Sequence, residues 1–73
     1  MLSMNICSLV GTNIRKARQA KGWTQDELSH ESGVDRSYLS EVESGTKNIG
    51  IVKLEALANA LDVEIQTLLT PTD

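Results

Sequence analysis

The chain has 73 residues and a formal net charge of −3, which allows one small domain and leaves no room for a deep cofactor cleft. A single cysteine, Cys7, and a single histidine, His30, exclude an intrachain disulfide and a protein-only zinc site. No segment approaches the ~20 apolar residues of a membrane span, and the first residues form a poor signal peptide, so we expect a cytoplasmic protein.

The charges are distributed unevenly along the chain. Residues 1–25 carry four basic side chains and no acidic one, whereas residues 26–47 carry six acidic and two basic ones, and residues 48–73 four acidic and one basic. A dipolar domain can turn a basic side to phosphate despite its net charge, because the local field governs the encounter. The alternative is a set of solvated surface charges.

Helical spacing begins after Gly11. Residues 12–21 form the first predicted helix, and Gly22 follows it as a residue typical of a helix C-terminus. Thr24-Gln25-Asp26-Glu27 is a capping box, which starts a second helix of about nine residues that ends at Gly33.

Three further helices complete the predicted domain. Asp35 caps a helix over residues 36–44, a fourth helix covers residues 51–61, and a short fifth covers residues 64–69. No segment alternates with period two over a useful length. We therefore expect an all-α, five-helix domain over residues 1–73, with a core from about 10 to 69 and short terminal tails.

The second and third predicted helices are joined by Gly33-Val34-Asp35. Two short helices with a three-residue turn containing Gly match the helix-turn-helix motif, whose second helix lies in the major groove of DNA. We expect Val34 to fill the space between the two helices. Many small helical hairpins share this turn, so the spacing alone leaves DNA binding and a purely structural hairpin open.

Five stretches together carry a resemblance to a known family: Ile14-Arg15-Lys16-Ala17-Arg18, Gly22-Trp23-Thr24-Gln25-Asp26-Glu27-Leu28, Ser32-Gly33-Val34, Ser40-Glu41-Val42-Glu43-Ser44-Gly45 and Leu54-Glu55-Ala56-Leu57-Ala58-Asn59-Ala60-Leu61. The chain resembles the Cro/phage-repressor type of helix-turn-helix proteins, the XRE family, over about residues 10–69. Asp35-Arg36-Ser37-Tyr38-Leu39-Ser40 and Lys47-Asn48-Ile49 are most similar to the controller proteins of restriction–modification systems.

The resemblance implies a compact repressor-like domain that regulates transcription by binding double-stranded DNA. It implies a homodimer on a palindromic operator, in one form a restriction–modification controller that both activates and represses. RNA polymerase is a further candidate partner.

The same resemblance assigns roles to individual residues. Arg36 begins the third predicted helix and can contact guanine O6 and N7 in a bidentate manner. Base reading is expected of Arg36, Ser37, Ser40 and Glu41, although Glu41 is equally compatible with a solvent-facing position. Contacts with the DNA backbone, alone or together with base contacts, are expected of Thr24, Gln25, Tyr38, Ser44, Lys47 and Asn48. Tyr38 is alternatively a half-buried packing ring.

Two structural expectations complete the set. The resemblance implies an ion pair between Arg18 and Glu43, which would fix the recognition helix to the first helix. The last two helices carry more apolar side chains than one thin core needs, so we expect a dimer interface. Its candidate contacts are Ile51, Val63, Ile65 and Leu69. The alternative is a well-filled core.

The residue inventory argues against an enzyme. There is no second histidine, no phosphate-binding loop of the GxxxxGK type and no plausible nucleophile–base pair. No cofactor, metal or membrane partner is expected. The second hypothesis for function is an antitoxin or another protein-interaction module with a repressor-like fold, whose apolar C-terminal surface would bind the partner.

Overall fold

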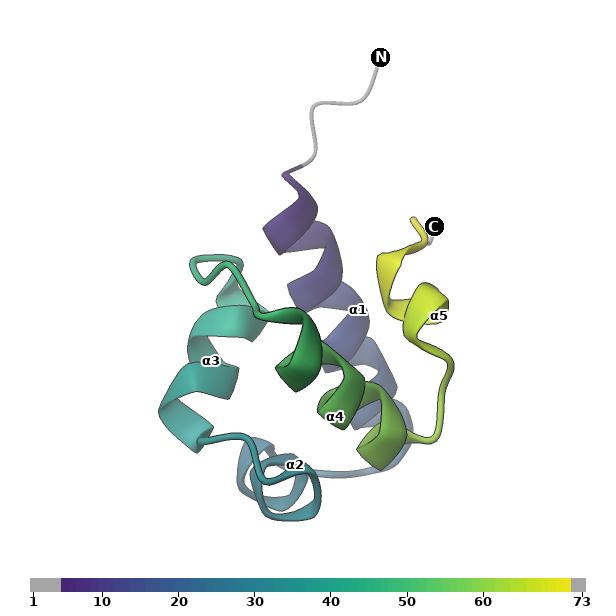
Figure 1. The fold of residues 1–73 in the computed structure, drawn as a ribbon. Helices are drawn as coiled ribbons and strands as arrows, with labels where there is room; N and C mark the ends of the chain where they lie inside the picture. The colour runs from purple at the N-terminus through teal and green to yellow at the C-terminus, as the bar shows by residue number, and fades with distance from the viewer. Residues whose placement is uncertain (1–4, 72–73) are drawn as a thin grey trace.

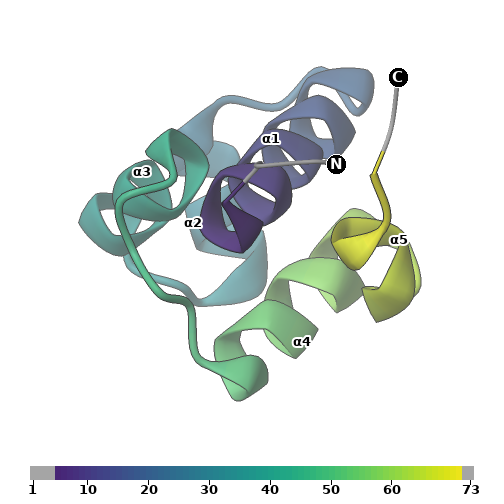
Figure 2. The same ribbon diagram turned by 90° about the horizontal axis from the view of Figure 1, so that it is seen from above.

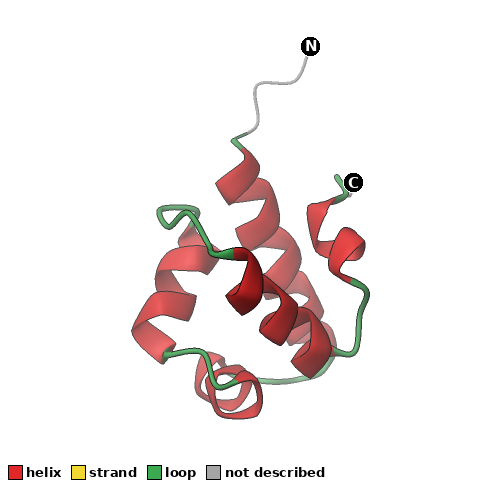
Figure 3. Ribbon diagram, viewed as in Figure 1, coloured by secondary structure: helices red, strands yellow, loops and turns green. Residues whose placement is uncertain are grey.

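The computed structural model describes residues 5–71 and contains five helices joined by short loops (Figures 1 and 3). They are α1 (Ile6–Ala20), α2 (Gln25–Ser32), α3 (Arg36–Ser44), α4 (Ile51–Leu61) and α5 (Ile65–Leu69). Residues 5–71 include no strand, which confirms the predicted all-α fold. None of these helices is long and apolar enough to cross a membrane.

Helix α1 runs through the middle of the domain. It packs against α3 on one side and α5 on the other, while α4 packs against α2 and α5. Figure 2 shows α2 and α3 together on one side of the molecule and α4 and α5 on the other. One face of α3 is thereby held against α1 and α2, and the opposite face is left to solvent.

All five helices meet in one core. Each contributes one aliphatic side chain with 0% exposure: Ile14, Leu28, Leu39, Leu57 and Leu68. Burying a side chain of this size contributes about 1.5–3 kcal/mol relative to leaving it exposed. The five helices therefore share a single core.

The predicted helix ends of α2 and α3 are confirmed. Thr24 Oγ1 accepts from the Glu27 N–H at 3.1 Å, and the Glu27 carboxylate accepts from the Thr24 N–H at 2.7 Å, which completes the capping box. Asp35 Oδ2 accepts from the Ser37 N–H at 3.0 Å, so this carboxylate caps α3.

The turn between α2 and α3 is stabilised by hydrogen bonds from α2. Gly33 has φ 76°, a left-handed conformation that favours glycine. Val34 is only 3% exposed, as predicted, and its carbonyl accepts from Ser29 Oγ at 2.6 Å while its N–H donates to Ser32 Oγ at 3.1 Å. These bonds fix the angle at which α3 leaves α2.

The predicted start of the first helix is wrong. Helix α1 begins at Ile6, capped by the Asn5 side chain, and Gly11 lies inside the helix rather than before it. The reason is a close approach between helices, because a Cβ at position 11 would collide with the Val42 carbonyl oxygen of α3. Gly11 is therefore required for packing and does not mark a helix boundary.

The short helix α5 is held to α1 by one side chain. Asn13 is buried in α1, and its Nδ2 donates to the carbonyl oxygens of Leu68 at 3.0 Å and Thr70 at 2.9 Å. These carbonyls end a five-residue helix and have no partner within it. The amide of Asn13 thus satisfies the C-terminus of α5.

We expect Gly11→Ala to lower the free energy of unfolding by about 1–3 kcal/mol, because the added methyl group forces α1 and α3 apart. The loss must exceed the intrinsic gain of about 0.5–1 kcal/mol that alanine brings to a helix interior. Urea unfolding followed by circular dichroism measures it. Gln19→Ala, on the exposed face of α1, is the control and should stay within about 0.5 kcal/mol of the parent. An unchanged or raised stability of Gly11→Ala would contradict the close approach.

Candidate nucleic-acid interface

The exposed face of α3 is polar. Its solvent-exposed residues include the four that were predicted to read bases: Arg36, Ser37, Ser40 and Glu41. Three of these line a surface hollow of about 290 Å³, namely Arg36, Ser37 and Ser40. This arrangement follows from the helical repeat, which turns Leu39 and Val42 into the core and the intervening residues outward.

Arg36 contacts an acidic residue of the preceding helix. Its Nε lies 3.0 Å from Asp26 Oδ1, and the two side chains are 64% and 76% exposed. The neighbouring Asp35 is engaged as the cap of α3. Exposed pairs contribute about 0–1 kcal/mol, so Arg36 remains free to contact another group. Sequence reasoning missed this pair because it joins residues ten positions apart across the turn.

A buried ion pair joins α1 to α3. The Arg18 guanidinium donates from Nε to Glu43 Oε2 at 2.8 Å and from Nη2 to Glu43 Oε1 at 2.9 Å. Its Nη1 donates to the Trp23 carbonyl oxygen at 2.8 Å. The two side chains are 12% and 3% exposed. The ion pair that the family resemblance implies is thus present, with a third bond to the loop before α2.

The hydrogen bond to Glu43 raises the pKa of Arg18, an effect larger than the lowering by burial. A raised folded-state pKa stabilises the protein fully at every pH below the unfolded-state value of arginine. This contribution is therefore constant across neutral pH.

Gln25 extends the same network to α2. Its Nε2 donates to Glu43 Oε1 at 3.1 Å, and the residue is half-buried. Gln25 was predicted to contact a phosphate, but in the structure its amide has an intramolecular partner. The bond joins the N-terminus of α2 to the last turn of α3 and so fixes their relative position.

Tyr38 of α3 forms a second cluster with two lysines that follow α3 in the chain. The half-buried Tyr38 ring has Lys47 Nζ and Lys53 Nζ each 5.2 Å from its centroid. Its hydroxyl accepts from the Gly50 N–H at 3.1 Å, and Lys47 Nζ also lies 3.2 Å from Glu41 Oε1. The ring packs against the core, and its contact with DNA stays a prediction. Sequence reasoning gave Lys53 no role, because nothing in the sequence places it near Tyr38.

The remaining predicted backbone contacts have other neighbours. Ser44 Oγ donates to the Glu41 carbonyl oxygen at 2.9 Å, and Thr24 caps α2. Asn48 is exposed and borders an apolar hollow instead of the face of α3. These three residues stay predictions as DNA contacts.

The apolar hollow lies between the first turns of α1 and α4 and the end of α5. Its volume is about 240 Å³, and it is lined by Ile6, Cys7, Val10, Asn48, Ile49, Ile51, Leu54 and Leu69. Of the predicted dimer contacts, Ile51 and Leu69 are 75% and 43% exposed, whereas Val63 and Ile65 are half-buried against the core of their own chain. Ile6 and Val52, 57% and 75% exposed, were not among the predicted contacts.

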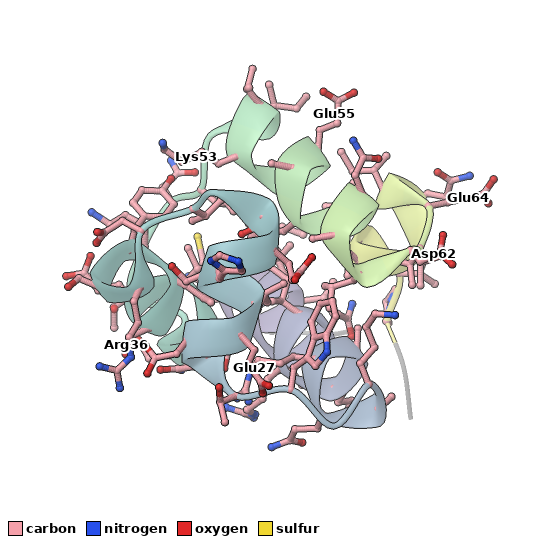
Figure 4. The ribbon with its side chains drawn as sticks, turned by 90° about the horizontal axis from the view of Figure 1, so that it is seen from below. Glu27, Arg36, Lys53, Glu55, Asp62 and Glu64 are labelled. Carbon is pink, nitrogen blue, oxygen red and sulfur yellow. The ribbon has the colours of Figure 1, made fainter. Side chains whose placement is uncertain are left out.

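The acidic side chains near α5 project away from α3. Figure 4 shows Asp62 and Glu64 on the opposite side of the molecule from Arg36. Lys53 lies on the same side as Arg36 in this view. The negative charges of Asp62 and Glu64 therefore lie away from the exposed face of α3.

Comparisons with known proteins agree with this geometry. A model of the helix-turn-helix family matches residues 14–68. The chain is 43% identical over 70 residues to the uncharacterized HTH-type transcriptional regulator y4dJ of Sinorhizobium fredii (strain NBRC 101917 / NGR234). The matched region covers 96% of this chain and 91% of that protein. The chain is also 41% identical to a hypothetical transcription factor of Neisseria meningitidis, but the match spans only 60% of that protein's length.

Two solved structures are similar over most of their length. The restriction-modification controller protein C.AhdI from Aeromonas hydrophila has a TM-score of 0.82 and 42% identity, covering 85% of this chain and 94% of its own. SinR, a master regulator for biofilm formation solved in complex with DNA, has a TM-score of 0.80 and 39% identity. The match covers 84% of this chain and 98% of the SinR chain.

We expect Glu43→Gln to lower the free energy of unfolding by about 3–5 kcal/mol, because it leaves the buried Arg18 guanidinium without its anionic partner. Chemical unfolding of both proteins measures the difference. Glu31→Gln removes the same charge from an exposed position of α2 and should change stability by less than about 0.5 kcal/mol. Similar small effects for the two variants would show that the ion pair contributes little.

Proposed function

Since the chain belongs to the helix-turn-helix family of Cro/phage-repressor (XRE) type and is a DNA-binding transcriptional regulator, we propose that it binds a palindromic operator as a homodimer. The observation that carries the proposal is the exposed polar face of α3, which a rigid turn and a buried ion pair hold in place. Helices of this motif enter the major groove with their first turns against base edges.

Arg36 is the residue proposed to carry most of the sequence preference. It is the only cation of α3, and its guanidinium is largely exposed. A bidentate contact with guanine O6 and N7 discriminates against other bases by about 1–3 kcal/mol. Ser37 and Ser40 lie beside it and can donate or accept, and Glu41 can accept from cytosine N4.

The phosphate backbone is proposed to lie against the two ends of the motif. Lys47 and Lys53 present cations at one end, and Thr24 and Gln25 begin α2 at the other. Contacts of this kind position the protein on DNA without reading sequence.

The homodimer is proposed to form through the apolar hollow and its rim. Ile51, Leu69 and Ile6 place exposed aliphatic surface around this hollow, and Val52, next to Ile51 in α4, is also exposed. Such a surface is uncommon for a monomer of this size. A two-fold axis there would place two copies of α3 about 34 Å apart, one turn of DNA.

The similarity to C.AhdI supports a narrower version, in which the protein controls restriction–modification genes as both activator and repressor. RNA polymerase is then a further partner. The exposed apolar side chains favour one second candidate, a protein-interaction module such as an antitoxin. No catalytic activity is proposed.

A selection on randomised duplex DNA in moderate salt tests the DNA proposal. We expect enrichment of a palindrome with half-sites about one helical turn apart. Arg36→Ala should relax or abolish the preference at one or more positions of each half-site, with an unchanged circular dichroism spectrum. Full retention of the preference would contradict the role of Arg36. A folded protein that enriches no sequence would favour the protein-interaction module.

We expect Ile51→Glu to weaken self-association at least about tenfold, because a charge would be buried at the two-fold interface. Sedimentation over a range of concentrations measures the dissociation constant. Asn59→Glu adds the same charge at another exposed position of α4 and should leave it unchanged. Equal self-association of both variants would place the interface elsewhere.

A further inference from the structure

We propose that Asp26 is a specificity-determining residue that acts by positioning Arg36 for base recognition. This inference rests on the proposed role of Arg36. It starts from the contact between Arg36 Nε and Asp26 Oδ1 at 3.0 Å. The carboxylate lies beside Nε, which leaves Nη1 and Nη2 to make a bidentate contact with guanine.

The position of Asp26 is fixed independently of Arg36. Asp26 lies in the first turn of α2, between Thr24 and Glu27, the two residues that form the capping box. A negative charge is favourable at a helix N-terminus, so the carboxylate is stable there without its partner. Both side chains are exposed, but that of Arg36 is much longer and would otherwise sample many more rotamers than that of Asp26. Asp26 is thus the fixed member of the pair and Arg36 the oriented one.

Asp26 does not assist binding to the DNA backbone. It is 76% exposed beside the face of α3 and carries the same charge sign as phosphate. Its effect on random DNA is therefore unfavourable, and any gain comes only where the oriented guanidinium meets the correct base. A residue that weakens non-specific binding and assists one base contact increases discrimination between sequences.

The test compares dissociation constants for the duplex recovered by selection and for the same duplex with the Arg36-dependent base pair replaced. Discrimination is the dissociation constant of the altered duplex divided by that of the selected duplex. We expect Asp26→Asn to lower this ratio about two- to fivefold, the range of an exposed ion pair. The same variant should bind a random-sequence duplex more tightly. Asp26→Glu keeps the carboxylate and should restore most of the ratio.

Two controls separate positioning from charge and from folding. Glu55→Gln removes one negative charge from α4, on a part of the surface well separated from Arg36 in Figure 4, and should leave the ratio unchanged. In an Arg36→Ala background, Asp26→Asn should no longer change the ratio, although it still strengthens binding to the random duplex. A merely structural role of Asp26 would not depend on Arg36.

The outcomes that overturn the proposal are distinct from those that overturn the proposed function. If Arg36→Ala lowers the ratio and Asp26→Asn leaves it unchanged, only the role of Asp26 fails. If Asp26→Asn strengthens binding to both duplexes equally, the carboxylate acts by repulsion alone and the proposal is wrong. If Arg36→Ala itself leaves the ratio unchanged, the proposed role of Arg36 fails, and the role of Asp26 fails with it.

Discussion

The carboxylate of Glu43 accepts hydrogen bonds from Arg18 of α1 and from Gln25 of α2, and it does so from within α3. Three helices thus meet at one buried anion, which is 3% exposed. Burying a charge is costly unless its partners satisfy it, so this group tolerates few alternative arrangements of the three helices. The orientation of the exposed face of α3 therefore depends on this interaction, which fixes α3 to two other helices.

The same constraint explains how an acidic protein can bind DNA. Its net charge of −3 disfavours a diffuse electrostatic attraction to the duplex. Affinity must then come from a few contacts that are held in the correct geometry. Two exposed charged side chains of α3, Arg36 and Glu41, are each held by an ion pair with an opposite charge. A weak general attraction combined with rigid local contacts favours discrimination over tight non-specific binding.

Local signals in the sequence predicted most of the fold correctly. The capping box at Thr24, the cap at Asp35 and the glycines that follow α2 and α3 act within one helical turn, so they can be read without knowing the neighbours. The same reasoning failed at Gly11, because the reason for glycine there is the backbone of α3, 31 residues later in the chain. A missing side chain at a helix crossing and one at a helix boundary look alike in a sequence.

The candidate site was predictable as a surface but not as a network. The family resemblance indicated Arg36, Ser37, Ser40 and Glu41, and all four are exposed in the structure. Sequence alone did not show that Asp26 contacts Arg36, that Lys53 lies over Tyr38 or that Val63 and Ile65 pack on their own core. Each of these depends on the relative placement of two elements, which periodicity within one element does not contain.

The bonds from Asn13 to the end of α5 have a consequence for the dynamics of the domain. A helix of five residues is too short to persist by its own hydrogen bonds, so α5 is ordered by the burial of Leu68 and by this one amide. Its opening therefore requires the loss of few contacts, whereas α1 and α3 can separate only when the buried ion pair breaks. We therefore expect the amide protons of α5 to exchange with solvent before those of α1 and α3.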